Sequence, residues 1–370
     1  MLIGIPKEIK NHEYRVGATP SNIRSLKNAG HTILVQEQAG AKVGFSNEDY
    51  EAAGAQIVSS AEKVYQSDMI IKVKEPQDAE FPLMHEEQTL FCFLHLAPDP
   101  IQARHLIERK VIAIAYETIT DAHGRLPLLV PMSEIAGRIA IQVGACALQM
   151  NHGGKGVLLG GVPGVAPAVV VVLGGGIVGT EAARMALGLG AQVIILDRDL
   201  NRLRQLDALF GPRLMTLYST PTSIEEALCK ADLVIGAVLI PGKKAPKLVS
   251  KEMIAAMAPG SVIVDVAIDQ GGCFETARPT THANPTYEVD GVVHYCVTNM
   301  PGACAATATR ALTNATMEYA LELANKGIKT ALLENAYLRQ GVNLYAGKVT
   351  YLPVAQDLGY EYFPLEACLS

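Results

Sequence analysis

The 370-residue sequence predicts an α/β protein with two doubly wound domains and a cleft between them. Short apolar runs alternate with helix-like segments along most of the chain, which is typical of mainly parallel sheets. A strand-turn-helix-strand pattern with clustered glycines begins only at Val169, so a separate α/β unit must come before it. The length independently suggests about two domains.

Composition narrows the class of protein. Hydrophobic residues make up 49% and charged residues 18% of the chain, which favours a compact globular protein. The net charge is −6 and no Lys/Arg block stands out, so neither nucleic acid nor a membrane is expected as a partner. No apolar run approaches the about 20 residues of a membrane span, and the N-terminus resembles a strand rather than a signal peptide. The seven scattered cysteines indicate reduced thiols in a cytoplasmic protein, and no cluster has metal-ligand spacing.

The first unit is predicted from apolar runs and capping residues. Thr19-Pro20 marks the start of a helix that runs to about Asn28 and is closed by Gly30. Further helices are expected at Asn47–Ala53 and Pro100–Arg109. The expected strands are Leu2–Ile5, Thr32–Val35, Met69–Val73, Thr89–Leu94 and Val111–Ala115.

The second unit follows a long helix that is expected from Ser133 to about Met150. Residues 153–166 are rich in glycine but lack the phosphate-loop pattern, so they are interpreted as a connection. An Ala/Thr-rich helix from Cys304 to about Lys326 is expected to return to the first unit. The second unit itself should contain strands at Val169–Leu173, Val193–Leu196, Arg213–Tyr218, Asp232–Val238, Ser261–Ala267 and Val292–Val297, with helices at Thr180–Gly190, Ser223–Lys230 and Ser250–Met257.

Residues 174–179, Gly-Gly-Gly-Ile-Val-Gly, match the G-x-G-x-x-G pattern between a strand and a helix. Asp197 ends the next strand, about 20 residues further on, which completes the Rossmann dinucleotide fingerprint. The glycines allow close approach of a pyrophosphate, and the helix N-terminus offers N–H groups to it. Asp197 can accept hydrogen bonds from ribose hydroxyls and disfavours a 2′-phosphate, so NAD is expected over NADP, although Arg198 partly offsets this. A glycine turn without a nucleotide is the alternative.

Polar residues that follow strands rank highest as candidates, because ligands of open α/β sheets bind beyond the carboxyl ends of the strands. Arg15, Lys74 and His95 follow the first, third and fourth strands of the first unit. Asp269 follows the fifth strand of the second unit. These four residues are expected to meet in the cleft.

The four candidates suit a small 2-amino or 2-oxo acid. Arg15 can bind a carboxylate bidentately, and Lys74 can add a second donor or polarise a carbonyl. His95 suits general acid–base catalysis, and Asp269 can orient an amino group or transfer a proton. Each has an ordinary alternative: Arg15 and Lys74 as surface charges, His95 as a core histidine, and Asp269 as a turn residue.

Several ordered motifs together resemble the alanine dehydrogenases and the related nicotinamide nucleotide transhydrogenase domain. The resemblance covers essentially the whole chain. The motifs that carry it are Ile3–Glu8, Glu13–Val16, Lys72–Pro76, Phe93–Ala97, Pro131–Gly137, Asp265–Gly272 and Thr298–Gly302.

The resemblance implies reversible conversion of L-alanine, NAD and water to pyruvate, ammonia and NADH. It implies that Arg15 and Lys74 bind the substrate carboxylate and carbonyl, and that His95 and Asp269 form the catalytic acid–base pair. The cofactor-binding residues that it implies are Ser133, Gly174, Gly176, Ile177, Val178, Gly179, Asp197, Arg202, Ser219, Val238, Leu239, Val266, Ala267, Ile268, Asp269, Arg278, Val297, Thr298, Asn299 and Met300.

The resemblance also implies a discontinuous substrate domain, residues 1–130 plus 305–370, around an NAD-binding Rossmann domain, residues 131–304. It implies a homohexamer. Two other functions are considered: a transhydrogenase-type nucleotide-binding subunit that works with a membrane partner, and a non-catalytic NAD-binding protein. The complete set of four candidate residues favours the dehydrogenase over both.

Overall fold

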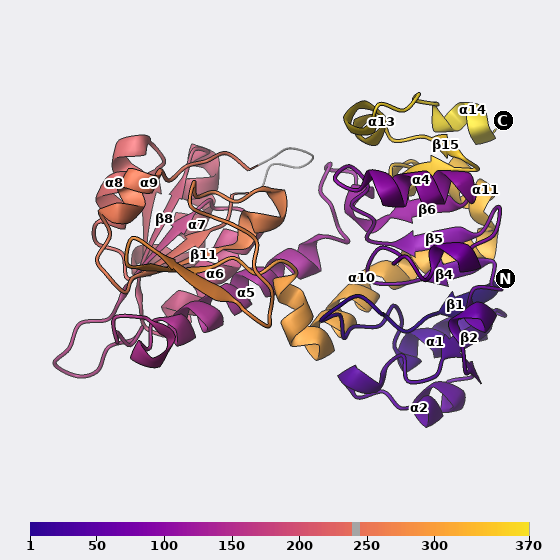
Figure 1. Ribbon diagram of the computed structural model, residues 1–370, viewed down its shortest axis with the longest axis horizontal. Helices are drawn as coiled ribbons and strands as arrows, with labels where there is room; N and C mark the ends of the chain where they lie inside the picture. Colours follow the sequence, from indigo (N-terminus) through magenta and orange to yellow (C-terminus); the bar gives the residue numbers. More distant parts are fainter. Residues whose placement is uncertain (239–244, 370) are drawn as a thin grey trace. The chain divides into compact units, whose positions relative to one another are not determined.

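A computed structural model describes residues 1–238 and 245–369 of the chain. The chain forms two compact units: residues 1–132 together with residues from 304 onward, and residues 133–303. Each unit contains a twisted sheet with helices packed on it (Figure 1). The predicted α/β fold with two doubly wound units is therefore confirmed. No helix in the described part of the chain is both long and apolar enough to cross a membrane.

The sheet of the first unit has the order β15-β14-β6-β5-β4-β1-β2-β3 among the described residues. The strands from β3 to β6 are parallel, and the strand order reverses at β1, which pairs with both β2 and β4. The strands are β1 (Leu2–Ile5), β2 (Thr32–Gln36), β3 (Gln56–Val58), β4 (Met69–Ile71), β5 (Thr89–Cys92), β6 (Ile112–Ala115), β14 (Val342–Tyr345) and β15 (Lys348–Val349).

The helices of the first unit begin at capping residues that the sequence shows. Thr19 and Asn22 form a reciprocal capping box at the start of α1, with Pro20 as the first helical residue. Asp99 caps α4 with its side chain alone, by accepting from Gln102 N. The helices are α1 (Pro20–Asn28), α2 (Asn47–Ala52), α3 (Ala61–Val64), α4 (Pro100–Glu108), α10 (Ala305–Lys326), α11 (Ile328–Glu334), α12 (Ala336–Arg339), α13 (Leu352–Leu358) and α14 (Leu365–Leu369).

The C-terminal segment completes the sheet and the core of the first unit. Strand β14 pairs antiparallel with β6, and β15 pairs antiparallel with β14. Leu344, Val349 and Val354 are buried in one apolar cluster with residues of β4, β5 and β6. The sequence predicts the helix that returns to this unit but not the β14–β15 hairpin.

The sheet of the second unit has the order β12-β13-β11-β10-β7-β8-β9 in the described range. Its parallel strands follow the Rossmann order, reversing between β7 and β10, as predicted. Among the strands of this sheet, the antiparallel edge strand β12 was not predicted, and neither was helix α7 (Leu200–Phe210) of the same unit. The strands are β7 (Val169–Leu173), β8 (Gln192–Asp197), β9 (Leu214–Tyr218), β10 (Leu233–Gly236), β11 (Val262–Asp265), β12 (Thr286–Val289) and β13 (Val292–Tyr295).

Two helices begin about one turn earlier than predicted. Helix α5 starts at Val130 because Pro131 fits a first helical turn, where no N–H is needed. Helix α6 starts at Ile177, so the last residues of the glycine fingerprint belong to its first turn. The helices of the second unit are α5 (Val130–Ala147), α6 (Ile177–Gly188), α7 (Leu200–Phe210), α8 (Pro221–Leu228) and α9 (Lys251–Ala255).

Five predicted strands end earlier than expected, and the difference has a physical reason. Strands β4, β5, β10, β11 and β13 end at the last residue of their paired register, although single backbone hydrogen bonds such as Phe93 N–H to Val73 O continue beyond it. The apolar residues that follow, such as Val73 and Leu94, remain buried, so apolarity alone extended the predicted strands. The segments beyond these ends carry the candidate residues.

We expect Gly179→Ala to destabilise the protein and Gly188→Ala, in the same helix, to leave it unchanged or more stable. A Cβ at Gly179 would lie 1.9 Å from the carbonyl oxygen of Gly174, whereas nothing lies within 4 Å of one at Gly188. Overpacking costs about 1–3 kcal/mol, and replacing an exposed helical glycine gains up to about 1 kcal/mol. Thermal unfolding midpoints of the two variants measure the difference. Equal shifts would contradict the close packing of the glycine turn against α6.

Candidate active site

Three of the four candidate residues follow neighbouring parallel strands of the first unit. Arg15 lies in the segment after β1, Lys74 follows β4, and His95 follows β5. Since β1 pairs with β4 and β4 with β5, these residues lie beyond the same edge of the sheet, at and beside its point of reversal. The first unit therefore gathers one guanidinium, one ammonium and one imidazole at this edge.

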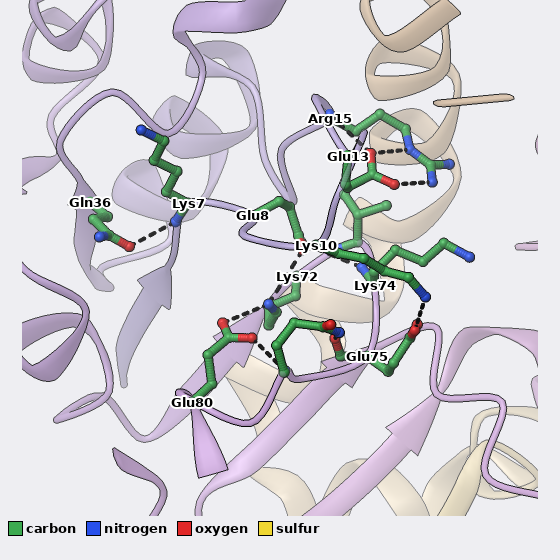
Figure 2. Close-up of polar contacts among 12 residues, drawn as sticks. Lys7, Glu8, Lys10, Glu13, Arg15, Gln36, Lys72, Lys74, Glu75 and Glu80 are labelled. Atoms are coloured by element: carbon green, nitrogen blue, oxygen red, sulfur yellow. Dashed lines mark hydrogen bonds and ion pairs between the residues drawn. The ribbon is translucent and has the colours of Figure 1, made fainter. Parts of the chain in front are cut away.

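Arg15 is buried, not a solvated surface charge. Its Nε and Nη2 donate to the two carboxylate oxygens of Glu13 at 2.7 and 2.6 Å (Figure 2). Its Nη1 lies 3.0 Å from the sulfur of Met132. The side chain of Glu13 is fully buried as well. This bidentate contact fixes the plane of the guanidinium, which is the group predicted to bind a carboxylate.

Lys74 is half-buried in a segment that carboxylates hold in place. Glu8 accepts the backbone N–H groups of Val73 and Lys74 at 2.6 and 3.3 Å. The adjacent Glu75 forms an ion pair with Lys10 (Figure 2). Burial alone would raise the pKa of Glu75, but the charges of Lys74 and Lys10 outweigh it and lower that pKa. Lys74 therefore adds positive charge to a partly enclosed site.

His95 is half-exposed, so it is not the core histidine of the alternative interpretation. Its φ of +49° lies in the left-handed region, which is unfavourable for a residue with a Cβ. Glu117 accepts the backbone N–H of His95 at 2.6 Å and that of Leu94 at 3.2 Å, and it lies 3.9 Å from His95 Nδ1. The imidazole also stacks on Phe93, with ring centroids 5.8 Å apart. Glu117 and Phe93 thus hold the backbone and the ring.

In the second unit, side chains hold the glycine turn from both sides. Asp197 accepts the N–H of Gly175 at 2.6 Å, and Arg202 donates to its carbonyl oxygen at 2.5 Å. Helix α6 has no side-chain cap at Gly176, where a Cβ would meet nothing within 4 Å. The turn therefore presents open space and the N-terminus of a helix, the arrangement that suits a phosphate group.

Most of the other predicted cofactor residues also follow strand ends. Ser219 follows β9, Val238 follows β10, and the segment after β11 forms a short 3-10 helix, η6 (Val266–Gln270), in which Asp269 is exposed. Leu239 lies outside the described residues. Beneath η6, burial raises the pKa of Asp265 to about 6, although the N–H groups of Cys273 and Ala267 donate to it. The remaining members are Ser133 in α5, Arg278 before β12, and Val297, Thr298, Asn299 and Met300 after β13.

Sequence reasoning missed the carboxylates that position the candidates. Glu8, Glu13 and Glu117 each bind a candidate residue or its backbone N–H group. Only Glu13 lies near its partner in the sequence, and no role was assigned to it. The contacts of Glu8 and Glu117 span 66 and 22 residues, a distance at which no local pattern links the partners.

The fold and the site together define a class of protein. Its members have two doubly wound α/β units of Rossmann strand order, and the second unit carries the glycine fingerprint. Family models confirm and narrow this class. The N-terminal domain of the alanine dehydrogenase/PNT family matches residues 4–136, and the C-terminal domain of that family matches residues 140–352. The chain belongs to the alanine dehydrogenase/PNT family, as its motifs indicated.

Relatives of known name match the chain over its full length. It is 56% identical to the alanine dehydrogenase of Methanococcus maripaludis, with 100% of both chains covered. It is 55% identical to the alanine dehydrogenase of Bacillus subtilis, with 100% of this chain and 98% of the relative covered. A solved structure of an L-alanine dehydrogenase superposes with a TM-score of 0.95 at 53% identity, covering 97% of this chain and 99% of that one.

We expect Glu117→Ala to release the backbone around His95. Hydrogen bonds to a charged group contribute about 1.5–3 kcal/mol, so amide exchange in residues 93–96 should accelerate about tenfold or more. Exchange measured by mass spectrometry reports this directly. Glu108→Ala is the matched control, because Glu108 also lies 3.9 Å from an imidazole, that of His105, but is exposed. Unchanged exchange at residues 93–96 would show that Glu117 does not hold this segment.

Proposed function

We propose that the protein is an NAD-dependent alanine dehydrogenase, which oxidatively deaminates L-alanine to pyruvate and ammonia and catalyses the reverse reductive amination. The observation that carries the proposal is that a chain of this family, matched over its full length by alanine dehydrogenases, carries Arg15, Lys74, His95 and Asp269 after strand ends. A buried arginine held in one plane, beside a lysine, suits a small carboxylate.

The residues of the second unit fit a dinucleotide. The glycine turn opens onto the N-terminus of α6, and Asp197 lies at the end of β8, where a ribose would be recognised. Asp197 already accepts backbone N–H groups from Gly175 and Asp199. A carboxylate has about four acceptor positions, so it can also bind ribose hydroxyls. NAD, when bound, supplies the hydride acceptor.

Residues of both units carry the remaining chemistry in this proposal. Arg15 and Lys74 bind the carboxylate and polarise the carbonyl oxygen of pyruvate. Glu117 faces Nδ1 of His95, so we assign proton exchange with the substrate oxygen to Nε2. Asp269 orients the amino group. The substrate domain is then the discontinuous first unit, and the NAD-binding domain is the second.

Assembly and location are part of the same proposal. We propose a cytoplasmic homohexamer, on the resemblance to the family. The free thiols of all seven cysteines, which lie within the described residues, suit a reducing compartment.

We expect the purified chain to oxidise NADH when pyruvate and ammonium are both present. The reaction is followed by the loss of NADH absorbance, and other 2-oxo acids serve as comparison substrates. Two alternatives give different results. A transhydrogenase-type subunit would pass hydride between nucleotides without pyruvate, and a non-catalytic protein would bind NADH without turning over any 2-oxo acid. Either result would overturn the proposal.

We expect His95→Ala to abolish turnover and leave the dissociation constant of NADH nearly unchanged, because His95 lies in the first unit. Asp197→Ala should do the reverse and raise the KM for NAD far more than the KM for alanine. Steady-state kinetics and NADH fluorescence titration measure both effects. Near-normal kcat in His95→Ala would contradict the acid–base role. Equal changes of both KM values in Asp197→Ala would argue against ribose recognition.

A further inference from the structure

A lysine that the proposed reaction does not use is completely buried beneath the candidate site. Nζ of Lys72 lies 2.7 Å from Glu80 Oε1 and 3.3 Å from Glu8 Oε2 (Figure 2). Both carboxylates are buried, and Tyr65 donates its hydroxyl to the same Glu80 oxygen at 2.8 Å. Burial raises the pKa of Glu8 and would lower that of Lys72, whose pKa the two carboxylates nevertheless raise.

Stability alone does not explain this cluster. Buried ion pairs lose so much hydration that apolar residues of similar volume are often equally stabilising. Hydrogen bonds constrain the orientation of the groups that they join, which apolar packing does not. The reason is that a donor and an acceptor bind well only within a narrow range of distances and angles.

The cluster orients the backbone of Lys74. While Oε2 of Glu8 faces Lys72, its Oε1 accepts the N–H groups of Val73 and Lys74 at 2.6 and 3.3 Å. Glu8 itself belongs to the segment after β1 that leads to Glu13 and Arg15 (Figure 2). One carboxylate thus joins the two segments that carry the proposed substrate-binding residues.

The same cluster reaches the histidine through aromatic contacts. The carbonyl oxygen of Lys72 accepts the hydroxyl of Tyr116 at 3.1 Å. The ring of Tyr116 meets Phe93 edge to face at 5.1 Å, and Phe93 stacks on His95. Lys72, Phe93 with His95, and Tyr116 follow the carboxyl ends of β4, β5 and β6, respectively.

We propose that Glu8 is a positioning residue of the reaction: it fixes the backbone at Lys74 relative to the Arg15 segment, so that both cations meet the substrate in one geometry. This rests on the proposed function. Glu80 has no such role, because its contacts are with Lys72, Tyr65 and the N–H of Gln77.

Two conservative variants separate positioning from simple stability. Glu8→Asp keeps the charge but shortens the side chain, which withdraws the oxygen from the N–H groups of Val73 and Lys74. Glu8→Gln loses the charge but keeps an oxygen at the same reach. Losing hydrogen bonds to a charged acceptor should raise the KM for pyruvate about tenfold or more in Glu8→Asp. Glu8→Gln should stay close to the wild type.

Glu80→Asp is the matched control, since it shortens the other carboxylate of the same cluster. We expect it to lower the unfolding midpoint at least as much as Glu8→Asp, with an unchanged KM for pyruvate. The dissociation constant of NADH should not change in any of the three variants. A purely structural role would lower the midpoint and the active fraction and leave the KM of the active enzyme as it was.

The outcomes are distinct. An unchanged KM for pyruvate in Glu8→Asp, or equal KM increases in Glu8→Asp, Glu8→Gln and Glu80→Asp, would overturn the positioning role while the reaction itself stands. Absence of pyruvate- and ammonium-dependent NADH oxidation in the wild type would overturn the proposed function and the positioning role with it. If Glu8→Asp fails to fold, Glu8→Gln still tests the proposal. A KM for pyruvate in Glu8→Gln that rises about tenfold, the increase expected for Glu8→Asp, would contradict it.

Discussion

The parallel alignment of strands is the constraint on which both units depend. Strands of a parallel sheet are buried on both faces, so they must be almost wholly apolar along their length. The burial of β4, β5, β10 and β11 at every position shows this. Polar chemistry is therefore concentrated at the last residues of the strands, such as Asp197 and Asp265, and in the segments that leave them. Since all carboxyl ends lie at one edge, those segments necessarily come together.

Carboxylates accept the backbone N–H groups that are left without a partner where the strands end. Where a strand ends, its next N–H groups lose their ladder partners and still need acceptors. Glu8 and Glu117 supply them in the first unit, and Asp197 and Asp265 supply them in the second. The raised pKa of Glu8 and that of Asp265, at about 6, show what this burial costs the ionised form. As a consequence, the segments after the strands keep a fixed conformation at the edge where ligands of such sheets bind.

The sequence was sufficient for the parts of this structure that local patterns determine. Strand β7 and the glycine turn were predicted because apolarity, glycine spacing and the following Asp197 are all close together in the chain. The β12–β13 hairpin was overlooked although Asp290-Gly291, both at positive φ, is a recognised two-residue turn signal. The β14–β15 turn, Ala346-Gly347, lacks such a signal. The roles of Glu8 and Glu117 could not be predicted, because their contacts exist only after distant segments have folded together.

The pairing of β14 with β6 has a consequence for the order in which the chain can fold during synthesis. Asn343 donates to Thr118 across 225 residues, and the whole second unit is inserted between them. The inserted unit is continuous and can fold once it has left the ribosome, whereas the first unit must wait for its last strands. Until then β6 is an exposed sheet edge above an incomplete core, a state prone to pairing with other chains. Early folding of the insert shortens the effective loop and lowers the entropic cost of closing that edge.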